Sequence, residues 1–407
     1  MMQFGLLGRK LGHSYSPMIH SLIGSSPYCL YEQEPENVGD FLRNGDFDGL
    51  NVTMPYKKDV IPFLDEMDPL ALRLGAVNTI VKRDGRLKGY NSDYFGFRSL
   101  LNRSGIDVAG KKALVLGSGG ASATARAVLE DRGARVVVIS RRGEHNYDNL
   151  SLHADAALLV NTTPLGMYPN TGAAAVDVSR FPHLEGVLDV VYNPARTQLL
   201  LDCEKLGIPC WNGLWMLVAQ AVQSARWFLD RELPESLVAN IHRKLRNQME
   251  NIALIGMPGC GKSTIGRLLA RETGMRFVDA DAQIEALAGK SIPEIFARDG
   301  EEEFRRLETQ VLADLGKQSG LILSTGGGCV TRERNYPLLH QNSRILWLRR
   351  DTASLPTAGR PLSQKTDPAV LYEQRRPLYE AFADAAVDND GTQGETLTAI
   401  LKLLEVL

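Results

Sequence analysis

The chain contains few cysteines, and no two of them have the close spacing that zinc sites and redox motifs use. The five cysteines among 407 residues are Cys29, Cys203, Cys210, Cys260 and Cys329. An odd number of scattered cysteines predicts a reduced chain with neither a zinc site nor a disulfide framework. The N-terminal region also lacks a long apolar run, so we expect a cytoplasmic protein that neither spans a membrane nor is secreted.

The chain also has no marked excess of positive or negative charge. Lys and Arg number 46 against 48 Asp and Glu, which gives a formal net charge of -2, and no long basic block occurs. Nucleic acid is therefore not an expected partner. The chain has no internal repeat and no low-complexity segment, and its length suits two to three domains of roughly 150 residues each.

Short apolar segments that alternate with helical patterns are abundant. They are QFGLLG (3–8), GLNVTM (49–54), KALVLG (112–117), RVVVIS (135–140), ALLVNTT (157–163), GVLDVVY (186–192), NIALIG (251–256), GLILST (320–325) and RILWLR (344–349). Strands that alternate with helices predict an α/β protein with parallel sheets built from βαβ units. Open parallel sheets bind ligands at the carboxyl ends of their strands, where most of these segments end in Gly, Asn, Ser or Thr.

The segment 234–250 marks the boundary between two halves. Its charged sequence places Leu237, Ile241 and Leu245 four residues apart, which predicts a helix with one apolar face. The helix runs directly into the strand NIALIG. We therefore expect a first half over residues 1–248 and a second over 249–407.

A glycine-rich loop, GSGGAS at Gly117–Ser122, follows a strand and opens a helix in the first half. This arrangement is typical of a dinucleotide site. The next strand ends at Ser140, Arg141 and Arg142, where an acidic residue would select NAD. Two arginines instead favour the 2′-phosphate of NADP through charge-assisted hydrogen bonds. For Arg142 alone, a solvated strand end is an equally good interpretation.

Four segments rich in hydroxyl, amide and charged groups surround predicted turns in the same half. They are HSYSP (13–17), NVTMPYK (51–57), GAVNT (75–79) and GYNSDYFG (89–96). Such groups can pair with a substrate that carries several hydroxyls. Lys57 and Asp93 are the natural acid–base pair, because an ammonium oriented by a carboxylate can donate the proton that hydride transfer to a carbonyl requires. Taken singly, Asp93 would be a helix N-cap and Lys57 a surface charge.

With these motifs in this order, the first half resembles shikimate dehydrogenase over essentially its whole length. The resemblance implies Lys57 and Asp93 as catalytic residues and a Rossmann NADP-binding domain at 93–212, with the α/β substrate domain at 1–92 and 213–248. The implied substrate contacts are Ser14, Ser16, Thr53, Lys57, Asn78, Asp93, Tyr192 and Gln220. The implied cofactor contacts are Gly117, Ser118, Gly119, Gly120, Ala121, Arg141 and Gly213. The sequence departs from the family at Ser140, Arg142, His145 and Trp215.

A second phosphate-binding loop, GMPGCGKST at Gly256–Thr264, follows a strand and precedes a helix in the second half. This is a complete Walker A sequence, in which backbone N–H groups surround phosphates. Lys262 meets the outer phosphate charge, and Ser263 offers a hydroxyl to Mg²⁺. Cys260 within the loop is interpreted as a small filler.

Later motifs in the second half supply acids, arginines and glycines. Asp279 and Asp281 follow a strand, whereas Arg305 and Glu308 share one helix face. A run of glycines, 326–328, permits close backbone approach to a ligand. Arg360 and Arg375 follow near the end of the chain, and each alone would be interpreted as part of a surface ion pair.

These motifs resemble shikimate kinase across the second half, which implies a P-loop kinase domain with a parallel sheet at 249–407. The resemblance implies Lys262 and Asp281 as catalytic residues. It implies shikimate contacts at Asp281, Arg305, Gly327 and Arg375. It implies ATP contacts at Gly259, Cys260, Gly261, Lys262, Ser263, Thr264 and Arg360, with Ser263 and Asp279 near Mg²⁺.

The two resemblances together predict a bifunctional enzyme that uses NADP(H), ATP and Mg²⁺. The first half would reduce 3-dehydroshikimate to shikimate, and the second would phosphorylate shikimate. Two alternatives stay open. In the first, both domains act on a related hydroxy acid such as quinate. In the second, one domain is a catalytically silent sensor.

Overall fold

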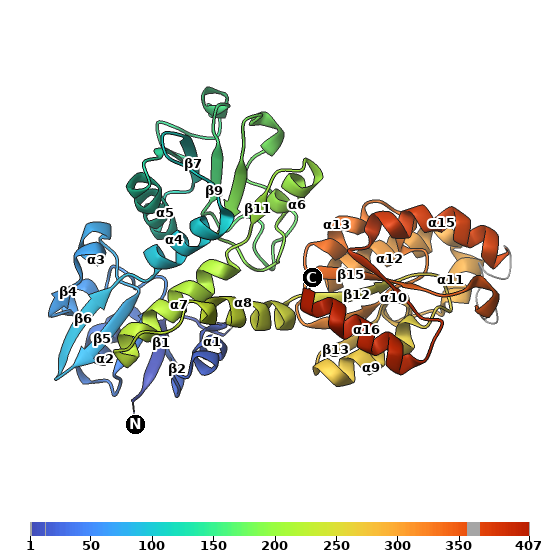
Figure 1. Cartoon of the computed structure of the whole chain (residues 1–407), viewed down its shortest axis with the longest axis horizontal. Coiled ribbons are helices and arrows are strands. Elements are labelled where there is room, and N and C mark those ends of the chain that lie inside the picture. The colour runs from blue at the N-terminus through green and yellow to red at the C-terminus, as the bar shows by residue number, and fades with distance from the viewer. Residues whose placement is uncertain (1, 13, 356–366, 407) are drawn as a thin grey trace. The chain divides into compact units, whose positions relative to one another are not determined.

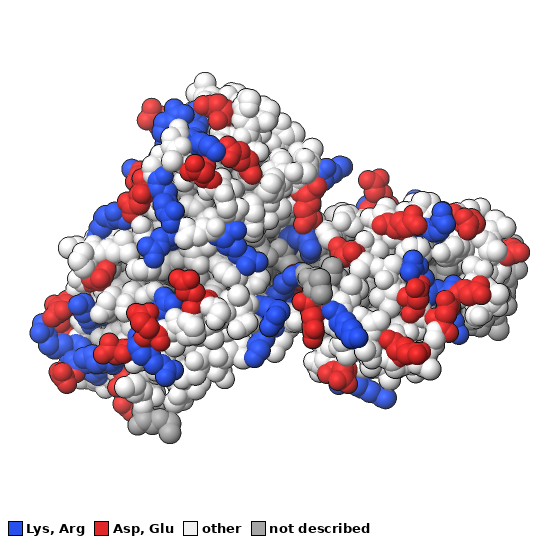
Figure 2. All heavy atoms as spheres, in the orientation of Figure 1, with Lys and Arg blue, Asp and Glu red and all other residues white. Residues whose placement is uncertain are grey.

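The computed structural model describes residues 2–12, 14–355 and 367–406, so Arg360 lies outside the described residues. The chain forms two compact units. The first comprises Met1–Leu165, Ala174–Tyr192 and Asp202–Leu245, and the second comprises Gly166–Ala173, Asn193–Leu201 and Arg246–Leu407. No helix within the described ranges is long and apolar enough to cross a membrane. Figure 2 shows basic and acidic side chains interspersed over one face of both units, as the near-zero net charge predicts.

The first unit begins with a six-stranded sheet in the order β2-β1-β3-β5-β6-β4 (Figure 1). Its strands are β1 (Phe4–Gly8), β2 (Tyr28–Glu32), β3 (Gly49–Val52), β4 (Glu66–Met67), β5 (Thr79–Arg83) and β6 (Arg86–Tyr90). Helices α1 (Ser16–Ile23), α2 (Val38–Asn44) and α3 (Pro69–Leu74) lie between them in the chain. Strands β5 and β6 pair antiparallel, as do β3 and β5, so this sheet is mixed, whereas the alternating pattern predicted parallel pairing. For β5 and β6 the reason is the turn at Asp84 and Gly85, whose positive φ angles of 50° and 75° suit a two-residue hairpin.

A five-stranded sheet in the order β11-β10-β9-β7-β8 follows, and all its strand pairs are parallel. Its strands are β7 (Lys112–Leu116), β8 (Arg135–Ile139), β9 (Leu158–Asn161), β10 (Gly186–Asp189) and β11 (Cys210–Trp211). The accompanying helices are α4 (Asp93–Ser104), α5 (Gly120–Asp131), α6 (Gln198–Lys205) and α7 (Leu214–Leu229). Arg83 at the end of β5 donates a 2.8 Å hydrogen bond to the carbonyl oxygen of Phe228 in the last turn of α7.

The second unit contains a parallel five-stranded sheet in the order β13-β14-β12-β15-β16. Its strands are β12 (Asn251–Ile255), β13 (Arg276–Asp279), β14 (Leu321–Ser324), β15 (Ser343–Arg349) and β16 (Ala385–Asp388). Helices α12 (Gly300–Gly316), α13 (Asn335–His340) and α15 (Pro368–Phe382) lie on one side of it in Figure 1, and α9 (Lys262–Thr273) and α16 (Gln393–Val406) on the other. Helices α10 (Ala280–Ala288) and α11 (Ile292–Arg298) connect β13 to α12.

The nine apolar segments that predicted strands each contain one, so these predictions are confirmed. The helix predicted over 234–250 is also confirmed, as α8 (Ser236–Met249), with Ile241 and Leu245 buried. It ends two residues before β12 begins. The α/β class is therefore correct, with one mixed and two parallel sheets.

Candidate active sites

Lys57 and Asp93 are brought together at the carboxyl edge of the six-stranded sheet. Lys57 follows β3, Asp93 begins α4, and the Lys57 Nζ lies 2.5 Å from the Asp93 Oδ2. Their side chains are 27% and 17% exposed, so the pair is accessible to a small ligand without being fully solvated. The geometry allows Asp93 to orient the ammonium, and the catalytic role of the pair remains a prediction.

A buried polar network lies behind this pair, and Ser224 on α7 is its centre. The Ser224 Oγ lies 2.7 Å from the Asn51 Nδ2, 3.0 Å from the Thr79 Oγ1 and 3.0 Å from the Ser92 Oγ. The side chains of Ser224, Thr79 and Ser92 have no exposed surface. The Ser92 hydroxyl in turn reaches the Gln220 Oε1 at 3.1 Å. The network therefore ties β3, β5, the start of α4 and α7 together.

The network also includes Asn78, which the sequence predicts as a substrate contact. Its Oδ1 accepts a 2.6 Å hydrogen bond from the Ser92 backbone N–H, one residue before Asp93. Its Nδ2 donates to the Ser92 Oγ at 3.0 Å. Asn78 is buried, so at least part of its hydrogen-bonding capacity serves the fold rather than a ligand.

The remaining predicted substrate contacts of this half lie in partly buried positions. The Ser16 backbone N–H donates to the Ser14 Oγ at 3.2 Å where α1 begins. The Tyr192 ring meets the Tyr15 ring edge-on at 6.2 Å, and burial raises the pKa of the Tyr192 phenol. Thr53 is partly exposed just beyond β3. No hydrogen bond in the described residues defines a role for Tyr192 or Thr53, and their roles remain predictions.

The predicted dinucleotide loop connects β7 to α5, and its last residues form the first turn of that helix, where backbone N–H groups have no partner within the helix. Beyond β8 the backbone N–H of Ser140 bonds to the carbonyl oxygen of His145 at 3.1 Å and closes a short loop. Arg141 and Arg142 lie exposed in that loop. Gly213, at the start of α7, permits a close approach, because a Cβ there would lie 2.0 Å from the carbonyl oxygen of Val190.

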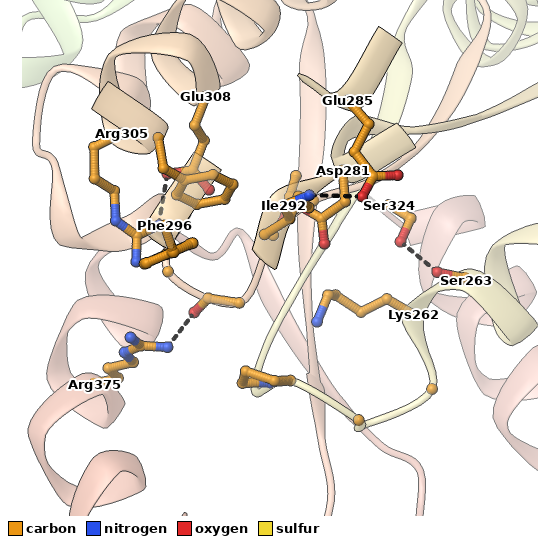
Figure 3. Close-up of a pocket in the computed structure, with 18 of the residues that line it drawn as sticks. Lys262, Ser263, Asp281, Glu285, Ile292, Phe296, Arg305, Glu308, Ser324 and Arg375 are labelled. Atoms are coloured by element: carbon orange, nitrogen blue, oxygen red, sulfur yellow. Dashed lines mark hydrogen bonds and ion pairs between the residues drawn. The ribbon is translucent and has the colours of Figure 1, made fainter. Parts of the chain in front are cut away.

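A cavity of about 580 Å³ occupies the carboxyl end of the sheet in the second unit. It is lined by residues of the Walker loop, α10, α11, α12, the glycine run and the ends of β14 and β15. Figure 3 shows that Lys262, Asp281, Arg305 and Arg375 come from different elements and surround the same space. The structure thus brings together most of the predicted kinase residues.

The Walker loop is held by polar contacts of its own side chains. The Lys262 Nζ donates to the carbonyl oxygens of Gly256 and Met257 at 2.9 Å and 3.0 Å. The Ser263 hydroxyl donates to the Asp279 Oδ2 at 2.7 Å, and it lies 3.0 Å from the Ser324 hydroxyl. Ser263 and Ser324 line one side of the cavity, and the Asp279 carboxylate is joined to that side through Ser263.

A set of charged groups on α10, α12 and α15 lines the other side. The buried Arg305 donates to the Glu308 Oε2 at 2.8 Å and reaches the Glu301 Oε1 at 3.2 Å. Arg375 donates to the carbonyl oxygen of Gly327 at 3.1 Å. The Asp281 Oδ1 is buried without a hydrogen-bond partner among the described residues. Burial, followed by the neighbouring Asp279, raises the pKa of the Asp281 carboxyl.

The glycine run approaches these charged groups closely. A Cβ at Gly328 would lie 2.3 Å from one terminal nitrogen of Arg305. This position therefore has room for the guanidinium only because it carries no side chain.

Several residues at these sites were not assigned a role from the sequence. Thr79 and Ser92 lie within predicted motifs, and Ser224, which lies outside them, completes the reductase network, whereas Glu285 and Arg350 line the kinase cavity. Glu285 could have been predicted from the sequence, because it lies one helical turn after Asp281 and therefore on the same helix face. The Glu285 Oε1 accepts a 2.8 Å hydrogen bond from the backbone N–H of Ile292, where α11 begins.

The fold and sites define a Rossmann-type dehydrogenase joined to a P-loop phosphotransferase. The family model "Shikimate dehydrogenase substrate binding domain" matches residues 6–80, and the model "Shikimate kinase" matches residues 258–405. An NADP(+)-dependent shikimate dehydrogenase of Clostridium perfringens is 36% identical over 268 residues, which are 60% of this chain and 99% of that relative.

Solved structures agree with this match. Shikimate dehydrogenase 1 of Peptoclostridium difficile is 37% identical, with a TM-score of 0.56, over 60% of this chain and 98% of that one. The shikimate 5-dehydrogenase of Thermus thermophilus, in complex with NADP(H) and shikimate, is 30% identical, with a TM-score of 0.55, over 60% of this chain and 99% of that one. The chain belongs to the shikimate dehydrogenase family and carries a shikimate kinase domain in its C-terminal part.

Proposed function

We propose that the first unit reduces 3-dehydroshikimate to shikimate with NADPH. The main support is the Lys57–Asp93 ion pair, in which the Nζ and Oδ2 atoms lie 2.5 Å apart. When bound, NADPH would supply the hydride that adds to the carbonyl carbon, and negative charge would develop on the carbonyl oxygen. The Lys57 ammonium donates a proton to that oxygen while Asp93 orients the amine. Hydroxyl and amide groups of Ser14, Ser16 and Gln220 pair with the substrate's other polar groups.

NADPH binds along the Gly117–Ala121 loop in this proposal. The N–H groups at the start of α5 meet the pyrophosphate. Arg141 pairs with the 2′-phosphate, and Gly213 lies at the nicotinamide end of the cofactor. The match to NADP(+)-dependent relatives supports this choice of cofactor.

The second unit then transfers the γ-phosphoryl group of ATP to the 3-hydroxyl of shikimate. Asp281 accepts the proton of the attacking hydroxyl, and its unpartnered Oδ1 is free to do so. Arg305 and Arg375 pair with the carboxylate of shikimate, and Lys262 stabilises charge on the transferred group. The kinase family match over residues 258–405 supports this assignment.

The oxygens of Ser263 and Asp279 fit Mg²⁺, because a hydroxyl and a carboxylate 2.7 Å apart are hard ligands of the kind this ion prefers. When bound, Mg²⁺ supplies positive charge beside the phosphates. Residues 249–407 form the kinase domain, and the reductase divides at 93 and 213 into substrate and cofactor domains. We place the enzyme in the cytoplasm, with small molecules rather than nucleic acids or membranes as its partners.

The test is NADPH oxidation by the purified chain given 3-dehydroshikimate, with and without ATP and Mg²⁺, with products followed by mass. Loss of NADPH together with phosphorylated shikimate only in the presence of ATP supports both reactions. Faster turnover of 3-dehydroquinate, or phosphorylation of quinate instead of shikimate, would replace the proposed substrates. Reduction without any phosphorylation would leave the second unit as a sensor.

A further inference from the structure

Arg350 is a cation in the kinase cavity that the proposed reaction has not used. It follows directly after β15 and lines the cavity together with Gly259, Gly261 and Lys262 of the Walker loop. Its Nε is buried and has no hydrogen-bond partner within the described ranges. A guanidinium nitrogen that is removed from water without a partner is costly, so this group is suited to meet an anion in the cavity.

The neighbouring arginine has a different environment. Arg349 donates to both carboxylate oxygens of Asp388 on β16, at 2.8 Å and 3.0 Å, and its side chain is 43% exposed. Arg349 is therefore used in a surface ion pair, whereas the next residue, Arg350, lines the cavity.

The order of the sheet decides which of the two substrates Arg350 meets. Strand β12 leads into the Walker loop, with β14 and β13 on one side of it and β15 on the other. Asp281 and the glycine run follow β13 and β14. Arg350 follows β15, and since Ile255 pairs with Trp347, the Walker loop leaves the sheet beside the last residues of β15. Arg350 is thus on the nucleotide side, away from the proposed shikimate groups.

We propose that Arg350 binds the phosphate chain of ATP and is a determinant of nucleotide affinity in this kinase unit. This inference rests on the proposed phosphotransferase function. Guanidinium–phosphate hydrogen bonds are charge-assisted and frequently bidentate, so their loss is measurable as weaker binding.

The experiment compares Arg350→Gln with Arg349→Gln in the full chain. We expect Arg350→Gln to raise the KM for ATP by about 10- to 100-fold, as loss of a charged hydrogen bond predicts. The KM for shikimate should stay within about twofold, because the proposed acceptor groups are untouched. Arg349→Gln removes a charge one residue away and should leave both constants unchanged. Arg350→Lys keeps the charge without the fork and should recover only part of the affinity.

Binding of ADP, measured by calorimetry on the same proteins, separates the two proposals. If the wild type binds ADP but phosphorylates no shikimate, then shikimate is not the phosphoryl acceptor. The role of Arg350 in nucleotide binding can still be judged from the ADP affinities. Equal ADP affinity in wild type and Arg350→Gln would overturn the inference, as would a rise confined to the KM for shikimate. The unfolding midpoint of the second unit reports on the folding of each variant, reductase activity shows that the first unit is intact, and Arg350→Lys provides a second variant if Arg350→Gln is unstable.

Discussion

Replacing Ser224 by alanine should destabilise the first unit far more than the loss of one hydroxyl suggests. The Ser224 Oγ is buried and lies within hydrogen-bonding distance of Asn51, Thr79 and Ser92. Alanine removes this shared partner without filling its place. A buried polar group left unsatisfied costs about 1–3 kcal/mol. Other bonds in the network persist, including that from the Asn51 Nδ2 to the Thr79 Oγ1 at 3.3 Å.

We therefore expect Ser224→Ala to lower the free energy of unfolding of the first unit by about 2–3 kcal/mol. For a unit of this size, that corresponds to a fall in Tm of roughly 4–10 °C. Reductase kcat/KM should also fall, because Ser92 precedes Asp93 and contacts Gln220. Kinase activity should not change, since Ser224 belongs to the first unit.

Intrinsic fluorescence during urea unfolding is a suitable assay, because Trp211, Trp215 and Trp227 lie in the first unit and Trp347 in the second. The matched control is Ser104→Ala at the end of α4, where the part-buried hydroxyl donates to the carbonyl oxygen of Leu101 at 2.7 Å and accepts from the Ile106 backbone N–H at 3.3 Å. The reasoning is refuted if the two variants lose the same small amount of stability, or if Ser224→Ala leaves reductase kinetics unaltered.

Further predictions concern both active sites and the response to pH. Lys57→Ala should lower reductase kcat by about 10²- to 10⁴-fold with kinase kinetics unchanged, measured on one preparation. Gly328→Ala should displace the Arg305 guanidinium and raise the KM for shikimate about tenfold or more, while the KM for ATP stays constant. Burial lowers the pKa of His20 from its usual 6.5 to about 3, so only the unfolded state takes up a proton as the pH falls below 6.5. The contribution of His20 to the free energy of unfolding is therefore complete above pH 6.5 and is lost as the pH falls toward 3. The loss amounts to about 2 kcal/mol between pH 7 and 5. Urea titrations of His20→Gln should show a flatter dependence, and an unchanged slope would contradict this account.

Sequence patterns reveal the strands of this protein where burial makes them apolar on both faces. Strand β14 (LILS) is fully buried and easily predicted, whereas β2 (YCLYE) at a sheet edge is half exposed and was missed. The hairpin of β5 and β6 was also missed, although Asp84-Gly85 between two strands is a strong turn signal.

Motif residues were predictable because their spacing along the chain is short. The Ser224 centre was not, since it joins Asn51 across 173 residues of sequence. Such a partner is defined only when the sheet and α7 pack together. Arg349 and Arg350 are adjacent arginines, so the sequence does not show which of them lines the cavity. Only the structure distinguishes them, because Arg349 pairs with Asp388 and Arg350 lines the cavity.

Helix α7 has a mechanical consequence for the reductase. Its 16 residues span roughly 24 Å as one uninterrupted helix that begins directly after Gly213 and carries Gln220 and Ser224. It is fastened to β5 near both ends of that strand, through Thr79 and through Arg83. If Gly213 contacts NADPH and Gln220 contacts the substrate, as proposed, a displacement of one end of this helix also moves the other end, and the binding of the two ligands is coupled through α7. Any movement of the five-stranded sheet relative to the six-stranded sheet then has to bend the chain outside α7.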